Sequence, residues 1–350
     1  MPGNSFGTVF KITTWGESHG KGVGVVIDGC PPKIPLDETI IQSMLDRRRP
    51  GKTIASTTRK EPDKAVMISG VFNGWTTGTP IMIMVENTDA DSSAYQPYAD
   101  YFRPGHGDFT YEAKYGIRDW RGGGRASARE TVARVAAGAV AKALLEKEKI
   151  SVIAYTVELG GIKALACDWR GEPDNMFLCP DGNAAIAMEK RVAEVKKSGN
   201  SLGGIVEIVA KGVPAGLGEP VFDKLDADLA KAVMSIGAVK GVEIGAGFKV
   251  ASALGSENND PITPEGFSSN NAGGILAGIS NGDDIVIRAA IKPIPSIEIE
   301  QQTIDRSGNP VTISIKGRHD ISAIPRINVV CEAMVSLVLA DHLLRQRAIS

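Results

Sequence analysis

The sequence predicts an α/β protein of the α+β type: an internally duplicated β-α-β sandwich with antiparallel sheets, core helices and two halves related by a pseudo-twofold axis. A repeated segment is the main observation behind this prediction. Residues 22–31 and 204–214 both run from a glycine through β-branched residues to a polar residue, a second glycine and a proline. A helix-like stretch follows each segment, and a long apolar stretch closes each half. We therefore expect one domain over residues 1–350, with halves of about 1–150 and 151–350.

The remaining elements follow in the same order in both halves. Residues 36–47 and 222–236 carry apolar residues at helical spacing. Residues 66–71 and 80–85 flank a glycine/threonine turn, and residues 273–279 and 284–291 flank a Ser-Asn-Gly turn, so each pair predicts a hairpin. Residues 128–145 and 327–344 predict the two long helices. The alternative is a chance likeness between common strand–turn–helix patterns.

Composition and charge exclude several classes of protein. The net charge of −2 argues against a general nucleic-acid binder. The four cysteines have no metal-binding spacing and predict neither a zinc site nor a disulfide framework: Cys30, Cys167, Cys179 and Cys331. We find no targeting signal, and the apolar stretch 327–339, interrupted by Asn328 and Glu332, is too short to span a bilayer. We expect a cytoplasmic protein with no membrane partner.

Two histidines lie in unusual surroundings. His19 stands in Gly-Glu-Ser-His-Gly at 16–20, and His106 stands in Arg-Pro-Gly-His-Gly-Asp at 103–108. Flanking glycines let the backbone bend so that the ring can meet a ligand, and histidine exchanges protons near neutral pH. The alternative is a turn histidine bonded to nearby backbone. Ser18 beside His19 suggests a hydrolase, but the segment lacks the Gly-x-Ser-x-Gly elbow, which disfavours that interpretation.

Two segments concentrate positive charge. Six cations and no acid lie between residues 47 and 60, and four arginines lie between 121 and 134 behind three consecutive glycines. Ser127 and Glu130 have the spacing of a capping box, which predicts that the helix begins near residue 128. Arg125 and Arg129 would then lie beside its free N–H groups and bind a phosphate or carboxylate. The alternative is a set of solvated surface ion pairs.

Three separated segments resemble the chorismate synthase family, and together they span essentially the whole chain. They are residues 16–20 running on to Asp-Gly at 28–29, Gly-Arg-Ala-Ser-Ala-Arg-Glu-Thr at 124–131, and Gly-Arg-His-Asp at 317–320 leading into Glu-Ala at 332–333. The Arg-Arg-Arg-Pro-Gly run at 47–51 and residues 103–108 also fit. The combination is highly specific.

The resemblance implies a reaction. It is the 1,4-anti elimination of phosphate from 5-enolpyruvylshikimate 3-phosphate, which gives chorismate for aromatic amino-acid biosynthesis in the shikimate pathway. The family requires reduced FMN although the reaction has no net redox change. The substrate carries two carboxylates and a phosphate, and FMN carries another phosphate. Two arginine-rich segments in a chain of balanced charge agree with this chemistry.

The resemblance also implies roles for individual residues. His19 and His106 would be the general acids for the departing phosphate and the reduced flavin, and Asp320 would assist proton removal at the flavin. Contacts to substrate or NADP fall to Ser18, Arg48, Arg49, Arg129 and Arg134. Contacts to FMN fall to Arg125, Ala126, Ser127, Gly237, Ala238, Gly278, Lys292, Pro293, Ile294, Pro295, Ser296 and Arg318. No metal is implied.

Some features stay open at this point. Many relatives have an arginine where this chain has Ile54, and Lys52 or Arg59 could replace it. The chain would either reduce its flavin with NADPH or receive it from an external flavin reductase. The family is homotetrameric. A non-catalytic module that binds flavin or a phosphorylated ligand is the alternative function, and the two glycine-flanked histidines argue against it.

Overall fold

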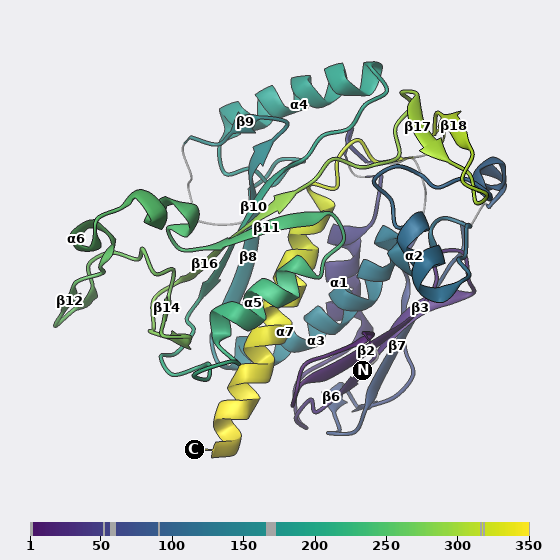
Figure 1. Cartoon of the computed structure of the whole chain (residues 1–350). Helices are drawn as coiled ribbons and strands as arrows, with labels where there is room; N and C mark the ends of the chain where they lie inside the picture. The colour runs from purple at the N-terminus through teal and green to yellow at the C-terminus, as the bar shows by residue number, and fades with distance from the viewer. Residues whose placement is uncertain are drawn as a thin grey trace.

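The chain forms two antiparallel sheets with a layer of helices between them (Figure 1). The structure, a computed structural model, describes residues 3–51, 53–56, 61–89, 92–165, 173–315, 317 and 319–349. Predictions that concern Lys52, Arg59, Cys167 or Arg318 fall outside these residues. The predicted sandwich with antiparallel sheets and core helices is confirmed.

The first sheet belongs to the N-terminal half. Its strands follow the order β1 (Ser5–Phe6), β2 (Lys11–Gly16), β3 (Gly22–Asp28), β7 (Ile81–Glu86) and β4 (Ala65–Met67). Alternate residues of β7 are buried, so one face of the sheet is turned towards the core. The pairing of β4 with β7 confirms the first predicted hairpin, although a small hairpin of β5 (Val71–Phe72) and β6 (Trp75–Thr76) lies within its connection.

The second sheet belongs to the C-terminal half. Its strands follow the order β11 (Val239–Ile244), β16 (Ile285–Ile291), β10 (Gly204–Lys211), β8 (Ser151–Leu159) and β9 (Ile162–Lys163). The four strands β2-β3-β7-β4 and β8-β10-β16-β11 occupy matching places in sheet order and in chain order. This correspondence supports the duplication that the repeated segments predict.

Four helices fill the layer between the sheets. They are α1 (Glu38–Arg48), α3 (Thr131–Lys147), α5 (Leu225–Met234) and α7 (Arg326–Ile349). Helix α1 begins where the Asp37 side chain accepts hydrogen bonds from the amides of Thr39 and Ile40. Helix α3 contacts β2, β3 and β7, whereas α7 contacts β8 and β10 and also packs along α3. The α3–α7 contact therefore joins the two halves.

The second predicted hairpin is wrong. Strand β16 pairs with β10 and β11, and not with residues 273–279. That segment instead forms a separate hairpin of β14 (Ile275–Leu276) and β15 (Ile279–Ser280). Its turn residues Ala277 and Gly278 have φ of 52° and 86°, a left-handed conformation that closes the turn after two residues. The equivalent of β4 is β11, which the sequence analysis had not assigned as a strand.

The other elements lie around this core. The helices are α2 (Asp108–Tyr115), α4 (Gly182–Lys197) and α6 (Gly255–Asn258). The small strands are β12 (Ile262–Thr263), β13 (Gly266–Phe267), β17 (Gln301–Ile304) and β18 (Pro310–Ile313), and the short 3₁₀ turns are η1 (Ser93–Tyr98), η2 (Gly124–Ala126), η3 (Ala128–Glu130) and η4 (Gly247–Ser252). Elements β12, β13 and α6 form an arm that projects from the body (Figure 1).

Helix α7 corrects the length argument made from the sequence. The helix has 24 residues, so by length and composition it could cross a membrane. All of its most apolar 18-residue window is buried inside the protein. Gly138 of α3 allows this close packing, because a Cβ there would lie 2.3 Å from the Cβ of Ala333. Helix α7 is thus the central helix of the core, and the apolar composition reflects burial between two sheets.

Candidate active site

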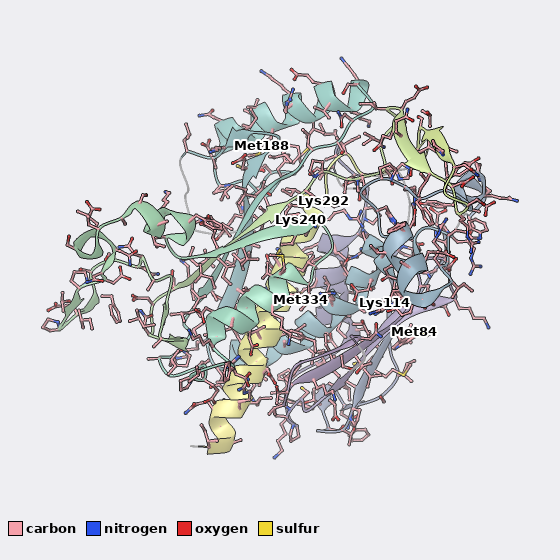
Figure 2. All side chains as sticks on the ribbon, viewed as in Figure 1. Met84, Lys114, Met188, Lys240, Lys292 and Met334 are labelled. Carbon is pink, nitrogen blue, oxygen red and sulfur yellow. The ribbon has the colours of Figure 1, made fainter. Side chains whose placement is uncertain are left out.

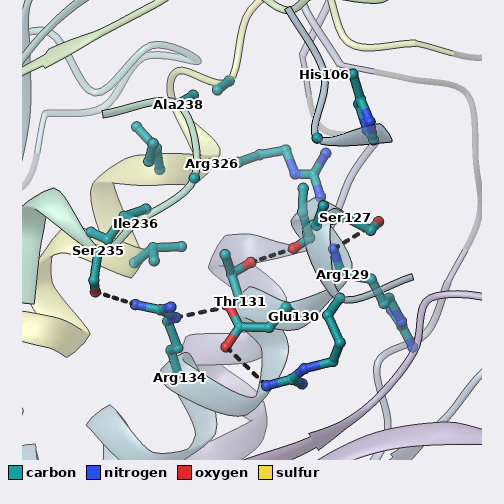
Figure 3. Close-up of a pocket in the computed structure, with 18 of the residues that line it drawn as sticks. His106, Ser127, Arg129, Glu130, Thr131, Arg134, Ser235, Ile236, Ala238 and Arg326 are labelled. Carbon is teal, nitrogen blue, oxygen red and sulfur yellow. Dashed lines mark hydrogen bonds and ion pairs between the residues drawn. The ribbon is translucent and has the colours of Figure 1, made fainter. Parts of the chain in front are cut away.

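A cavity of about 910 Å³ lies where the two halves meet, at the N-terminal ends of α3 and α7 (Figure 3). Its volume is in the range of small-molecule and cofactor sites. Charged side chains of its lining are mostly cationic. Among the described residues, eight are basic (Arg48, Arg103, Arg125, Arg129, Arg134, Lys231, Lys292 and Arg326), and three are acidic (Glu61, Glu130 and Asp320). The cavity is therefore suited to an anionic ligand.

The start of α3 differs from the predicted capping box. The Ser127 side chain accepts a hydrogen bond from the amide of Arg129, as expected of a cap. Glu130, however, does not bond back to the Ser127 amide, because its carboxylate accepts from Arg134 Nε at 2.8 Å and from Thr14 Oγ1 at 3.2 Å. Residues 128–130 form a 3₁₀ turn, and the α-helix begins at Thr131. Ser127 and Ala126 still line the cavity.

Arg48 and Arg129 are held inside the protein by one carboxylate. Arg48 is 1% exposed and Arg129 is 4% exposed, and both bond to the fully buried Asp63. Arg129 also donates to Asn87 and to the carbonyl of Glu86. Burial opposes ionisation of Asp63, but the charges and hydrogen bonds of the two arginines outweigh it and lower its pKa. Arg48 Nε is buried without a hydrogen-bond partner among the described residues.

The three consecutive arginines at 47–49 do not act as one cluster. Arg47 makes two hydrogen bonds, of 2.7 and 2.8 Å, to the buried carboxylate of Glu332. Arg49 is partly exposed, pairs with Asp46 at 3.4 Å and is not part of the cavity lining. Ile54, at the position of the family arginine, packs against the hydrophobic core. Among the described residues of this segment, Arg48 and Pro50 line the cavity.

Two other arginines face the cavity from the start of α3. Arg125 donates to Thr14 Oγ1 at 2.7 Å and to the carbonyl of Gly16 at 3.2 Å. Arg134 donates to Glu130 and, from Nη1, to Ser235 Oγ at 2.6 Å (Figure 3). Both guanidinium groups are partly exposed, and the single negative charge of Glu130 is shared between their two positive charges. They remain able to bind an anionic ligand.

His106 lines the cavity, as the sequence predicts. Its Nδ1 lies 3.0 Å from Asp108 Oδ1 and 3.1 Å from Arg103 Nη2. Asp108 in turn accepts two hydrogen bonds from the Arg103 guanidinium, at 2.7 and 2.8 Å. Burial opposes ionisation of Asp108, but these hydrogen bonds, with that from His106, hold its pKa well below the ordinary value. The carboxylate is therefore ionised under all physiological conditions.

His19 and Ser18 lie behind the cavity wall. The His19 ring packs on Gly122, where a Cβ would lie 2.4 Å from ring atoms Cδ2 and Nε2, and its Nδ1 is 2.9 Å from Ser92 Oγ. Ser18 is 1% exposed, and its hydroxyl has no hydrogen-bond partner among the described residues. Gly122 lines the cavity, while His19 and Ser18 do not. The His19 ring also packs edge-on against Tyr95, which lines the cavity.

The second half supplies most of the residues assigned to flavin. Gly237, Ala238, Lys292, Ile294, Pro295 and Ser296 line the cavity. Lys292 Nζ donates to the carbonyl of Gly105 at 2.6 Å, which ties this strip to the loop of His106. Burial and the charge of nearby Lys240 lower the Lys292 pKa (Figure 2). Pro293 is exposed and lies outside the lining, and so does Gly278, which packs on Lys224 before α5.

The segment before α7 adds Asp320 and His319. Asp320 accepts from Arg326 Nη1 at 2.5 Å and lines the cavity. His319 also lines it, and its Nε2 is buried without a protein hydrogen bond among the described residues. Burial and the charge of Arg103 lower the His319 pKa. Asp63 and Arg326 were not identified from the sequence, because only long-range contacts bring them to the site.

Comparisons with known proteins agree with the geometry. The family model for chorismate synthase matches residues 10–344. A chorismate synthase of Desulfosudis oleivorans is 71% identical over 100% of this chain and 99% of that protein. One from Desulfatibacillum aliphaticivorans is 64% identical over 99% of this chain and 97% of that protein. A crystal structure of a chorismate synthase superposes with a TM-score of 0.76 at 34% identity, covering 97% of this chain and 93% of the other.

Proposed function

We propose roles for the cavity residues from one established premise: the chain belongs to the chorismate synthase family. It is a lyase that removes phosphate from 5-enolpyruvylshikimate 3-phosphate and forms chorismate for aromatic amino-acid biosynthesis. The observation that carries the assignment of the site is a cation-rich cavity with His106 in its wall. Such a cavity combines anion binding with a group that can donate a proton to a leaving phosphate.

We assign substrate binding to the cations that the fold leaves available. Arg125, Arg134 and Lys292 line the cavity, and their protein partners leave N–H groups free to reach a carboxylate or phosphate. Arg48 adds its unpartnered Nε. Arg129 acts indirectly, because Asp63, Asn87 and the Glu86 carbonyl already hold its guanidinium. It keeps Asp63 in place beside Arg48.

We assign a general-acid role to His106, since of the two predicted acids it is the one that lines the cavity. Asp320 lines the same cavity and accepts a hydrogen bond from Arg326, and we assign it the assisting role in proton removal. His19 remains the second predicted acid. It contacts two residues of the lining, Gly122 and Tyr95, and would act on a ligand from behind them.

The residues present fit reduced FMN. Ile236, Ala323, Val330 and Met334 give the cavity an apolar surface suited to a flat ring system, and a Cβ at Gly237 would meet open space. Arg125, Ala126, Ser127, Ala238 and the strip at Lys292 and 294–296 would hold it. When bound, reduced FMN supplies electron density that assists departure of the phosphate and is regained within the same turnover. Gly278 would contact FMN only from another copy of the chain, because it lies outside this cavity.

We also infer that the protein is a cytoplasmic homotetramer. The projecting arm and its base expose large apolar side chains: Phe248 (77%), Val250 (47%), Leu254 (67%) and Ile262 (76%). Apolar groups gathered on an arm are typical of surfaces that another copy covers. Light scattering of the purified protein should give a mass four times 36.9 kDa, and a monomer would contradict this inference.

One assay tests the proposed function. Protein incubated without oxygen with 5-enolpyruvylshikimate 3-phosphate and chemically reduced FMN should release phosphate and form chorismate. His106→Ala should lower kcat by about 100-fold or more, as expected for lost general acid catalysis, and should retain flavin binding. If the wild-type protein bound flavin but formed no chorismate, the result would support the alternative function, a non-catalytic binding module.

The same assay identifies the source of reduced flavin. Oxidised FMN with NADPH alone should give no chorismate if an external flavin reductase is required, and adding a reductase should restore turnover. Turnover with NADPH alone would assign the reductase activity to this chain.

A further inference from the structure

We propose that Lys231 and Arg134 form an anion-binding subsite at the α5 end of the cavity, which takes a carboxylate or phosphate group of a bound ligand. The proposal rests on the proposed function and adds Lys231, a residue that no sequence motif indicates. It gives the cavity a second cationic end, away from the end that holds His106 and Lys292.

Lys231 is a cation of the cavity lining without a polar partner. It lies in the last turn of α5, is exposed and lines the cavity. Its ammonium group makes no hydrogen bond or ion pair with the described residues, and it lies 5.8 Å from the centre of the Phe6 ring, a cation–π contact. Phe6 also lines the cavity and packs against the core. The ammonium group therefore keeps its three N–H donors for a ligand.

The acid closest to Lys231 along the chain is already engaged by other residues. Asp228, one turn earlier on α5, lies 3.0 Å from His342 Nε2 and 3.7 Å from Arg345 Nη1. The hydrogen bond with His342 lowers the pKa of Asp228 most, burial opposes this effect, and Lys231 contributes through its charge alone. Asp228 therefore does not neutralise Lys231 by direct contact.

Arg134 brings a second cation to the same end of the cavity. Its Nη1 donates to Ser235 Oγ at 2.6 Å and its Nε donates to Glu130 at 2.8 Å, whereas Nη2 bonds to none of the described residues. Ser235 follows α5 directly and is four residues after Lys231, so the two side chains lie one turn apart on the same face. The bond to Ser235 therefore holds the guanidinium of the N-terminal half against the helix face that carries Lys231.

This pair of cations lies away from His106. Figure 3 shows Arg134 and Ser235 at one side of the cavity and His106 at the other, with Arg326 between them. Lys292 belongs to the His106 end, because its Nζ donates to the backbone carbonyl that precedes His106. Anionic groups can therefore be held at two separate ends of one cavity.

The surroundings of the pair strengthen its attraction for an anion. Phe6, Ile236 and Met334 line this end with apolar surface, which reduces the screening of charge by water. Two positive charges on one face repel each other, and an anion bound between them replaces that repulsion with attraction. A carboxylate or a phosphate has several acceptor oxygens and can bond to the ammonium group and to Arg134 Nη2 together.

Under the proposed function, two ligands bring groups of this kind. The substrate carries two carboxylates and a phosphate, and reduced FMN carries a phosphate. The shared chemistry is an oxyanion, and the measurements below separate the two sources.

The test is Lys231→Met, which removes the charge and keeps an unbranched side chain over Phe6. Turnover with chemically reduced FMN gives KM for 5-enolpyruvylshikimate 3-phosphate, and fluorescence titration gives the Kd of oxidised FMN. One of these two constants should rise by about fivefold with kcat changed less than about twofold, because a charged donor to a bound group is lost. A rise in KM alone assigns the group to the substrate, and a rise in Kd alone assigns it to the flavin phosphate. Changes below about twofold in both would overturn the inference.

Two further variants separate a lost contact from a general defect. Lys190→Met is the matched control, because Lys190 is exposed on α4 and does not line the cavity, and it should leave both constants unchanged. Lys231→Arg keeps the positive charge and should recover most of the loss, whereas a folding defect would affect both substitutions. Circular dichroism shows whether each variant is folded.

The double variant Lys231→Met/Arg134→Gln tests whether the two cations hold the same group. If they do, the loss of affinity should be smaller than the product of the two single losses, since either substitution alone already loosens the anion. A loss equal to that product would overturn a shared subsite. Absence of turnover in the wild-type protein would contradict the proposed function instead. Calorimetric titration with inorganic phosphate would then still test the subsite, because Lys231→Met should weaken phosphate binding and an unchanged affinity would overturn the inference.

Discussion

The arginines of the two basic segments serve two different purposes in this molecule. Arg48 and Arg129 are almost fully buried and share the carboxylate of Asp63. Arg125 and Arg134 keep part of their surface in the cavity and are bonded mainly to neutral or shared acceptors. The first pair holds the loop before β4 against the start of α3, and the second pair is available to a ligand. A count of cations along the chain does not distinguish them.

The Asp63→Asn variant tests whether the buried arginine pair is structural, and it should have the largest effect. The variant leaves two arginines in the interior without their carboxylate, so the free energy of unfolding should fall by about 3–5 kcal/mol. Urea denaturation measures this change. Asp46→Asn is the matched control, because it removes a partly exposed partner of Arg49 and should cost less than about 1 kcal/mol. Equal losses in the two variants would mean that burial does not separate the pairs.

The same comparison explains what sequence reasoning could reach. Helices α1, α3, α5 and α7 follow from local apolar spacing, which tertiary contacts reinforce. The glycine-flanked His106 was found because its motif is contiguous. The pairing of Arg48 and Arg129 with Asp63 was not found, since it joins residues 15 and 66 positions apart. No local pattern indicates which acid will meet which arginine.

Three other differences have a physical cause of the same kind. The Glu130 carboxylate accepts hydrogen bonds from Arg134 and Thr14, and not from the Ser127 amide. The capping box does not form because the charged guanidinium is a stronger donor than the backbone amide. Strand β16 pairs with β11 because the glycine-rich segment between them closes on itself. Arg49 turns outward because α1 ends there and Asp46 lies one turn back. Each outcome depends on which of several competing partners the fold brings closest.

The pH dependence of stability tests whether Asp63 is ionised between its two arginines. Because the pKa of this buried carboxyl is lowered in the folded protein, its contribution to stability is present above the unfolded value of about 4 and is lost as the pH falls through the folded value. The stability difference between the wild-type protein and Asp63→Asn should therefore shrink between pH 4 and more acid conditions. Urea denaturation at a series of pH values measures it. A difference independent of pH would contradict an ionised Asp63.

The Arg134→Gln variant tests the second pair, the cavity arginines Arg125 and Arg134. Removing a cation of the cavity should lower kcat/KM by about tenfold, which corresponds to about 1.4 kcal/mol, mainly through a higher KM. The free energy of unfolding should change by less than about 1 kcal/mol, because the ion pair with Glu130 is partly exposed. Arg191→Gln removes a comparable exposed helical pair with Glu194 on α4 and should leave both quantities unchanged. A purely structural Arg134 would show the opposite pattern.

The smallest expected effect concerns two lysines at the edge of the cavity. Lys240 is exposed on β11, and its charge contributes to the lowered pKa of Lys292 (Figure 2). Lys292 therefore loses its charge at a lower pH than an ordinary lysine, and Lys240→Met should raise that pH.

Substrate KM measured at alkaline pH should then fall by about twofold to threefold, the size expected of one exposed charge–charge interaction, and should be unchanged at pH 7. Lys249→Met, in η4 at the base of the projecting arm, supplies the same substitution away from the cavity and should leave KM unchanged at both pH values. If Lys240→Met raised KM at pH 7, Lys240 would itself be a ligand contact, and the division between cavity cations and surrounding cations would have to include β11.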